Sequence, residues 1–322
     1  MNNQIAGRVA VWMVGLSLLL GTGSMVRAQA WTLAPGAGYL KVFYGKVTAA
    51  EQYTFDGRRT DFIDGLPGDT FRDRSLYLYG EVGVKEHVSL FFSLPYKRVF
   101  IRDHAFRFRT FGLGTVTVGG RIGLLPLLGW RSSPHALALN VALGLPTGYT
   151  RNYAPSVDPG QVDVAAVLSY GISFYPFPGY AQVGIGGRLR TPLYVFSHRI
   201  DCQPGRDVHC IEDRRVDYGD ELLWSAELGG TLFGGGVLVQ VLANGRWSWQ
   251  PPRVGFSALN PIPLRQRYVK VGGGMTLFPF RWLGSSRLGA VGWSLQYFIT
   301  PYGRNTIRSR DLFAGISYRW GS

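Results

Sequence analysis

Apolar and polar residues alternate along most of the chain after residue 30, and the segment 237–250 shows the pattern clearly. A period of two residues is typical of β-strands, because successive side chains point to opposite faces of a sheet. One face of this segment carries Val237, Val239, Val241, Ala243, Trp247 and Trp249, and the other carries Gln240, Asn244, Arg246, Ser248 and Gln250.

Twelve segments of this kind follow one another, separated by polar breaks or by breaks rich in proline and glycine. We therefore expect an all-β protein whose strands are joined as successive hairpins. The predicted strands are 38–47, 73–84, 87–98, 112–125, 135–146, 161–174, 179–191, 219–232, 237–250, 265–278, 288–299 and 308–320.

The segments are long enough to cross a membrane, since a transmembrane strand needs roughly 9–11 residues and soluble strands are usually about 5–6 long. Several apolar faces also end in aromatic residues, which is typical of the interfacial girdles of outer-membrane barrels. We predict a transmembrane antiparallel up-and-down β-barrel of twelve strands; the alternative is a soluble all-β protein whose rings fill an ordinary core. The aromatic pairs are Tyr170 and Phe174, Trp247 and Trp249, Trp293 and Tyr297, and Tyr318 and Trp320.

The predicted connections alternate in length, with long breaks after the odd-numbered strands and mostly short ones after the even-numbered strands. Outer-membrane barrels have long extracellular loops and short periplasmic turns. With an even number of strands, both termini lie at the periplasmic end, and the last strand pairs with the first, which removes the open sheet edge. The long breaks are 48–72, 99–111, 147–160, 192–218, 251–264 and 300–307.

The first 30 residues have the form of a secretory signal peptide. Arg8 is the only charged residue before an apolar run over residues 9–20, and Ala28-Gln29-Ala30 matches an A-x-A cleavage site. We therefore expect residues 1–30 to be cleaved and residues 31–322 to form the barrel domain. The predicted location is the bacterial outer membrane, with lipid and the barrel assembly machinery as partners.

The chain is basic, with 34 Lys and Arg residues against 20 Asp and Glu residues and a formal net charge of +14. These residues are dispersed in a chain predicted to be exported, which argues against a nucleic-acid partner. An anionic lipid surface, or anionic solutes inside a pore, fits the charge better.

If the apolar face of each strand meets lipid, the polar face lines the lumen, and Tyr77 and Tyr79 lie on it. Charged residues on that face favour anionic solutes, and we expect Arg188, Arg190 and Arg246 to line a constriction that sets selectivity. The alternative is that these charges pair with each other and only hold the barrel rigid. Inward glycines such as Gly119 and Gly272 are expected to leave open volume. The predicted lumen charges are Lys41, Glu81, Arg121, Asp163, Arg188, Arg190, Glu227, Arg246 and Lys270.

The predicted function is passive passage of small solutes, with no cofactor. A second interpretation is a narrow or plugged barrel whose long loops, 48–72 and 192–218, serve surface binding or adhesion. No catalytic group is expected, because none of the five histidines falls in mid-strand beside a serine as a barrel-wall dyad would need. Cys202 and Cys210 are expected to form a disulfide in an extracellular loop, and no metal site is predicted.

Several stretches resemble the outer-membrane proteins grouped as the putative phenol-degradation meta-pathway transporter family. These are LYLYGEVGVKEHVSLFFSLPY at 76–96, GLGTVTVGGRIGL at 112–124, LALNVALGLPTG at 137–148 and PGQVDV at 159–164. The resemblance covers about residues 73–191 and rests on structural glycines, prolines and turns. It implies an outer-membrane barrel, with uptake of aromatic or other hydrophobic compounds as its activity, and it assigns no binding residue.

Overall fold

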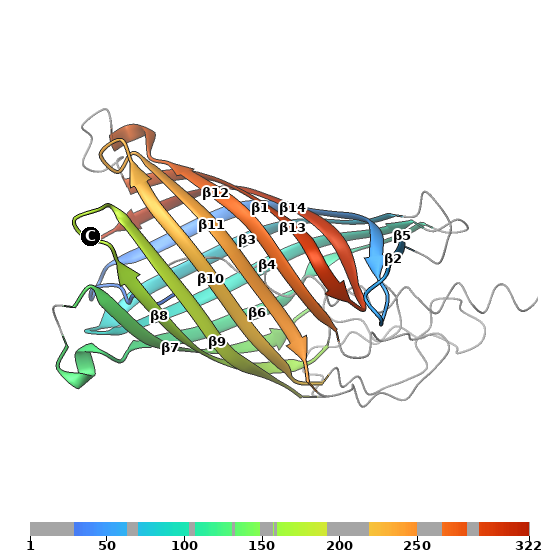
Figure 1. Ribbon diagram of the computed structural model, residues 1–322, viewed down its shortest axis with the longest axis horizontal. Helices are drawn as coiled ribbons and strands as arrows, with labels where there is room; N and C mark the ends of the chain where they lie inside the picture. Colours follow the sequence, from blue (N-terminus) through green and yellow to red (C-terminus); the bar gives the residue numbers. More distant parts are fainter. Residues whose placement is uncertain are drawn as a thin grey trace, which may run out of the picture.

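A single antiparallel sheet closes on itself to form a barrel in the computed structural model (Figure 1). The structure describes residues 29–62, 70–102, 107–130, 133–148, 157, 160–191, 219–249, 266–281 and 290–321. The long strands are β1 (Gly38–Tyr53), β3 (Thr70–Lys85), β4 (Val88–Arg102), β6 (Thr115–Gly123), β7 (His135–Pro146), β8 (Val162–Ser173), β9 (Gly179–Thr191), β10 (Glu221–Leu232), β11 (Val237–Ser248), β12 (Arg267–Leu277), β13 (Val291–Arg304) and β14 (Thr306–Trp320).

Two short strands extend this wall. β2 (Arg59–Asp61) pairs with the end of β1, and β5 (Arg107–Leu113) pairs with the second half of β4. β6 pairs with the first half of β4, so β5 and β6 together form one wall strand interrupted at Gly114. The wall therefore has the twelve strands that the sequence predicted. Short 3-10 helices η3 (Pro126–Leu128) and η4 (Pro279–Arg281) lie in connections.

The barrel closes where the first strand meets the last. β1 pairs with β14 from Gly38 opposite Trp320 to Tyr53 opposite Thr306, with a register shift between Thr48 and Glu51. This pairing confirms the predicted closure and leaves neither strand with a bare edge toward lipid.

The short connections 86–87, 174–178 and 233–236 lie at the same end of the barrel as the C-terminus (Figure 1). Because short turns are periplasmic in outer-membrane barrels, we call this the periplasmic end and the opposite one the extracellular end. Among the described residues, no helix is long and apolar enough to cross a membrane.

Some strands are longer than predicted at the extracellular end. β1 reaches Tyr53 and β13 reaches Arg304, and Asn305 alone joins β13 to β14 with a φ of 49°. The predicted long loop at 300–307 is therefore wrong. Strands that continue past the membrane meet water on their outer face, so their residues lose the apolar alternation from which the prediction was made.

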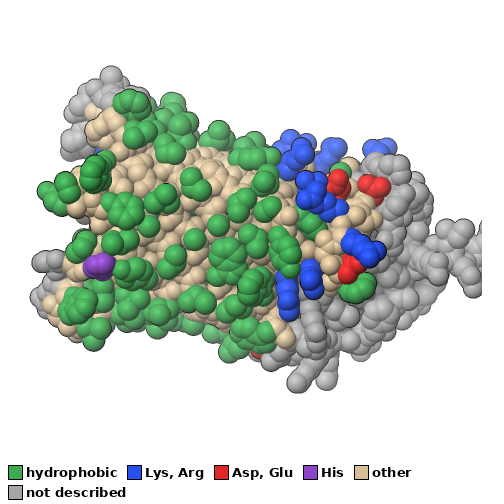
Figure 2. Space-filling view, in the orientation of Figure 1, with side chains coloured by type: hydrophobic (Ala, Val, Ile, Leu, Met, Phe, Trp, Pro, Cys, Tyr) green, Lys and Arg blue, Asp and Glu red, His purple; other side chains and the backbone are tan. Residues whose placement is uncertain are grey.

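The outer face carries a broad apolar band (Figure 2). Large apolar side chains on it are exposed, among them Val183, Ile185, Val241 and Ile316, each more than half accessible. A water-soluble protein rarely exposes so large a contiguous apolar surface, whereas a lipid-facing wall requires one. Exposed aromatic residues lie toward both ends of the band: Trp247 and Trp249 at the extracellular end, and Tyr170, Phe174, Tyr318 and Trp320 at the periplasmic end.

Residues 1–28 lie outside the described part of the chain, so the signal peptide and its cleavage site stay predictions. Gln29 and Ala30, which cleavage after Ala30 would remove, lie inside the barrel.

Candidate functional site: the barrel lumen

A segment that precedes β1, residues 29–37, lies in the periplasmic half of the lumen; we call it the N-terminal segment. Its main chain is bound by side chains of two nearby strands of the wall. Asn140 Nδ2 on β7 donates to the carbonyl oxygen of Gln29 at 3.2 Å, and the amide of Ala30 donates to Gln182 Oε1 on β9 at 3.4 Å. The segment therefore extends inside the barrel from β1 to β7 and β9.

Further contacts hold the same segment. Arg121 Nη1 on β6 donates to the carbonyl oxygen of Trp31 at 2.9 Å, and the amide of Leu33 donates to Ser89 Oγ on β4 at 2.9 Å. The indole of Trp31 packs edge-on against Tyr180, with ring centroids 5.9 Å apart. The periplasmic end of the lumen is thus occupied by the chain's own backbone.

One side of the lumen is aromatic rather than polar. Phe43 on β1 stacks on Tyr77 of β3 with centroids 4.6 Å apart and an interplanar angle of 4°, and Phe313 on β14 meets both Phe43 and Phe298 edge-on. We call this set the aromatic wall. Its members are Tyr39, Phe43, Tyr77, Tyr79, Phe91, Leu242, Phe298 and Phe313.

Gly119 and Gly272 are covered by these rings, so the expectation that they leave open volume is wrong. A Cβ on Gly119 would lie 2.8 Å from Cε2 of the Phe91 ring, and one on Gly272 would lie 2.5 Å from Cδ1 of the Phe298 ring. The glycines make room for rings from neighbouring strands, and a flat aromatic fills the space that a missing side chain leaves.

The opposite side of the lumen holds an ion cluster near the extracellular end, formed by five residues of β8 to β11. Arg190 Nε lies 3.2 Å from Asp163 Oδ1, and Arg246 Nε lies 3.2 Å from Glu221 Oε2. Arg188 pairs with Glu221 and lies 3.7 Å from Asp163 Oδ2. Three guanidinium groups therefore share two carboxylates, and we call these five residues the arginine cluster.

Two further charge sites lie deeper in the barrel. Glu81 accepts from Arg121 Nη1 at 2.8 Å and from the Tyr79 hydroxyl at 2.9 Å. Glu227 accepts from Gln182 Nε2 and Gln240 Nε2, each at 2.5 Å. Because these carboxylates are buried, their hydrogen bonds offset the cost of removing them from water.

A cavity of about 270 Å³ lies between the two sides. Tyr77, Tyr79 and Phe91 line it on the aromatic side, and Arg188, Arg190 and Arg246 line it on the other. Gln29 reaches its lining from the N-terminal segment. Small-molecule pockets usually measure roughly 300–1,000 Å³, so this cavity is slightly smaller than that range.

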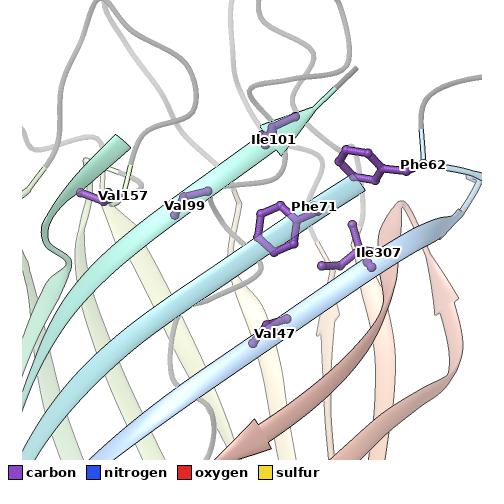
Figure 3. Packing of buried hydrophobic residues seen from close by; sticks show 8 residues of the cluster. Val47, Phe62, Phe71, Val99, Ile101, Val157 and Ile307 are labelled. Atoms are coloured by element: carbon purple, nitrogen blue, oxygen red, sulfur yellow. The ribbon is translucent and has the colours of Figure 1, made fainter. Parts of the chain in front are cut away.

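The extracellular end of the lumen holds a second apolar group, which we call the mouth cluster (Figure 3). Phe71 on β3 and Ile101 on β4 are fully buried there, and Phe62 and Val157 approach from connecting segments. Its members are Val47, Ala49, Phe62, Phe71, Val99, Ile101, Val157 and Ile307. The mouth cluster contributes no residue to the lining of the cavity, whereas the N-terminal segment contributes Gln29.

All nine charged residues predicted for the lumen point inward. Lys41 lies with its Nζ 5.1 Å from the centroid of the Phe43 ring, and Lys270 Nζ lies 2.5 Å from Asp311 Oδ2. The three predicted arginines lie close together and pair with Asp163 and Glu221. Glu221 was not among the predicted lumen charges.

The aromatic wall was missed apart from Tyr77 and Tyr79. On β1 the available signal was the polar residue Lys41, since Tyr39 and Phe43 each lie two residues from it and share its face.

Cys202 and Cys210 lie outside the described residues, so their disulfide stays a prediction. Within the described ranges, His, Cys, Asp and Glu side chains form no group of three or more that could hold a metal ion. Of the five histidines the structure describes two, and His135 Nδ1 lies 2.6 Å from the Tyr170 hydroxyl on the outer face.

Comparison with solved structures identifies the architecture. The crystal structure of the COG4313 outer membrane channel from Pseudomonas putida F1 superposes with a TM-score of 0.68 and 14% sequence identity, covering 94% of this chain and 100% of that chain. This is the fold of a bacterial outer-membrane protein. Together with the apolar outer band, it places the chain in the bacterial outer membrane.

Weaker similarities include other barrels. The translocator domain of the autotransporter NalP from Neisseria meningitidis gives a TM-score of 0.48 at 10% identity, covering 89% of this chain and 90% of that one. The CymD monoaromatic hydrocarbon channel gives 0.36 at 10% identity, covering 97% and 96%. No protein-family model and no curated protein sequence matches this chain, so the predicted phenol-degradation family is not confirmed.

Proposed function

We propose that the protein is a passive outer-membrane channel for small solutes that combine an aromatic body with an anionic group. The observation that carries the proposal is the cavity of about 270 Å³ between Tyr77, Tyr79 and Phe91 on one side and the arginine cluster on the other. Aromatic rings bind another ring by stacking, and guanidinium groups bind carboxylates by charge-assisted hydrogen bonds.

The charge balance supports an anionic group. Within the described residues, the arginine cluster has three positive and two negative groups, so a bound carboxylate would bring the local formal charge to zero. An incoming ammonium group would raise the positive charge of a site that is already buried, which is costly.

The fold shared with the COG4313 outer membrane channel supports passive passage as the general activity. The family that the sequence resembles is associated with uptake of aromatic compounds, which agrees with the aromatic side of the cavity. The arginine cluster adds a preference for anionic derivatives of such compounds.

Flux into proteoliposomes tests the proposal. Benzoate, benzylammonium and a neutral pentose have similar sizes but different charge and aromatic character. We expect benzoate to enter fastest, because it alone satisfies both sides of the cavity. Equal rates for all three, or faster entry of benzylammonium, would contradict the proposed selectivity.

One observation favours a second candidate, a plugged barrel that serves surface binding. The N-terminal segment is held inside the lumen by hydrogen bonds to β4, β6, β7 and β9. Of the two long loops that would bind a partner, 192–218 lies outside the described residues, and 48–72 is described except for residues 63–69. Planar-bilayer recordings separate the candidates: inserted protein that conducts no ions, with or without residues 29–36, would favour the plugged barrel.

A further inference from the structure

Basic side chains interrupt the outer face at one height, just beyond the extracellular edge of the apolar band. Along β3, outward-facing Val84, Val82 and Leu76 are followed by Arg74 and Arg72. On three other strands an outward apolar or aromatic residue likewise gives way to a basic one toward the extracellular end. These pairs are Tyr44 and Lys46 on β1, Tyr96 and Arg98 on β4, and Leu312 and Arg310 on β14. We call Lys46, Arg72, Arg74, Arg98, Arg102 and Arg310 the basic rim, and all six are exposed.

The strand register places these charges side by side. Lys46 is directly opposite Arg74, and Arg74 is directly opposite Arg98. Cβ atoms of directly opposite residues are only about 4.5–5.5 Å apart, and like charges in such pairs are destabilising. An anion between them would turn this repulsion into attraction.

Within the described residues, no carboxylate supplies that anion. Asp73 and Asp311 belong to the same strands but point inward and are buried, 1% and 2% exposed. Glu51 is engaged by Arg308, and Asp56 by Arg58. The ion pairs of the described chain thus leave the positive charges of the basic rim directed outward.

A hollow of about 770 Å³ lies beside the rim on the outer face. Lys46, Arg72, Arg74 and Arg310 line it together with the ion pair of Glu51 and Arg308 and the apolar side chains of Tyr297 and Ile299. Positive charge therefore meets an apolar surface at the depth where the headgroup of a lipid meets its acyl chains. In the view of Figure 2, the Lys and Arg side chains gather at the extracellular end, next to the apolar band.

Within the described residues, the exposed basic side chains of the extracellular end lie on one side of the barrel, since Arg107, Arg109, Arg267 and Arg304 belong to β5, β12 and β13, which continue the rim. At the same end, β8, β9 and β11 direct Val164, Leu189, Trp247 and Trp249 outward. A general attraction to an anionic membrane surface would favour positive charge all around the barrel. Concentration on the side formed by β12 to β14, β1 and β3 to β5 indicates a local ligand instead.

We propose that the basic rim and the adjoining hollow form a binding site for the phosphorylated glycolipid of the outer leaflet, with the lipid phosphates between Lys46, Arg72, Arg74, Arg98 and Arg310 and an acyl chain against Tyr297 and Ile299. Arg forms two parallel hydrogen bonds to a phosphate, and clusters of basic residues next to a membrane recognise multiply phosphorylated headgroups. The site is independent of what passes through the lumen.

Binding of lipopolysaccharide to the purified full-length protein in neutral detergent, followed by native mass spectrometry, tests this site. The test variant is Arg72→Gln with Arg74→Gln. The matched control is Lys85→Gln with Arg281→Gln, which removes the same charge from exposed positions at the periplasmic end. Each basic residue at an anionic lipid surface contributes roughly a fivefold gain in affinity, so we expect about a twentyfold loss in the test variant and little change in the control.

Two further probes identify the chemistry that the site recognises. Dephosphorylated lipid A should bind as weakly to the wild type as lipopolysaccharide binds to the test variant, and phosphatidylglycerol, with one phosphate, should bind more weakly than lipopolysaccharide. Equal affinity of test and control variants for lipopolysaccharide would overturn the proposal. So would equal affinity of the wild type for phosphatidylglycerol, because the rim would then be an unspecific anionic-lipid surface.

Thermal unfolding of the single variant Arg74→Gln gives a readout that does not depend on the double variant folding. Without lipopolysaccharide the variant should unfold at the same or a higher temperature than the wild type, because it removes two like-charge pairs. With lipopolysaccharide the order should reverse. A variant that is less stable under both conditions would show that Arg74 has only a structural role.

Discussion

The guanidinium of Arg121 contacts Glu81 Oε1 at 2.8 Å and the carbonyl oxygen of Trp31 at 2.9 Å. One side chain of the wall therefore neutralises a buried carboxylate and holds the N-terminal segment inside the lumen. Replacement of Arg121 should loosen the N-terminal segment, because it removes the charge-assisted hydrogen bond to the carbonyl oxygen of Trp31.

We predict that Arg121→Gln with Glu81→Gln raises single-channel conductance or the open fraction in planar bilayers. The double change avoids leaving Glu81 buried without its cation. A hydrogen bond from a charged group contributes about 1.5–3 kcal/mol, which corresponds to roughly a tenfold or greater shift toward a released segment. Ser317→Ala serves as the control, since its hydroxyl bonds Gly292 rather than the segment. Conductance equal to that of the wild type would show that the segment is not held by this contact.

Gly272→Ala should destabilise the barrel, whereas Gly273→Ala should be nearly neutral. A Cβ on Gly272 would meet the ring of Phe298 and the carbonyl oxygen of Tyr297, and the nearest atom to a Cβ on Gly273 is 3.6 Å away. Overpacking of this kind costs about 1–3 kcal/mol. The temperature at which each variant loses its compact form on a denaturing gel measures the difference, and equal temperatures would contradict the packing of rings over inward glycines.

Phe313→Ala should weaken the aromatic wall, because this ring contacts Phe43, Tyr77 and Phe298. Truncation of a buried phenylalanine costs about 3–5 kcal/mol. Phe233→Ala is a suitable comparison, since that ring is 74% exposed in a periplasmic turn. Denaturant titration in detergent micelles should show a large loss for the first variant only; similar losses would mean that Phe313 does not support the wall.

Glu221→Gln should increase the preference of the channel for anions. Glu221 bonds Arg188, Arg190 and Arg246, so its neutralisation leaves three guanidinium groups with Asp163 as their remaining carboxylate partner in the described chain. Reversal potentials under a salt gradient report the change, with Glu86→Gln in the exposed turn 86–87 as the control.

Neutralisation of the arginines, rather than of Glu221, tests the role that the sequence predicted for them. Conversion of Arg188, Arg190 and Arg246 to Gln should lower the anion preference. Unchanged ion selectivity in that triple variant would show that the arginine cluster holds the wall together without acting on permeating ions.

Much of the fold could be predicted from the sequence because the lipid-facing side of each strand repeats every second residue. The alternation at Val237, Val239 and Val241 is a local property and needs no knowledge of neighbouring strands. The pairing of Arg190 with Asp163 is different, because it depends on the register between β8 and β9. Charge counting alone could not decide between free arginines and paired ones.

The aromatic wall was hard to predict for a related reason. On β1 both faces are apolar, with Tyr39 and Phe43 inward and Val42 and Tyr44 outward. Alternation cannot separate two apolar faces, and a ring over an inward glycine becomes visible only when neighbouring strands are in place. The position of the N-terminal segment likewise follows from contacts such as Asn140 to Gln29, which join residues more than a hundred positions apart.

The hollow on the outer face can form only after β1 has paired with β14 and the barrel has closed. The hollow on the outer face takes its lining from residues 46–74 and from residues 297–310, which come from opposite ends of the chain and meet only across this seam. An unfinished barrel would present half of that surface. A ligand that recognises the whole surface binds the finished fold alone, and it therefore shifts the assembly equilibrium toward closure by mass action.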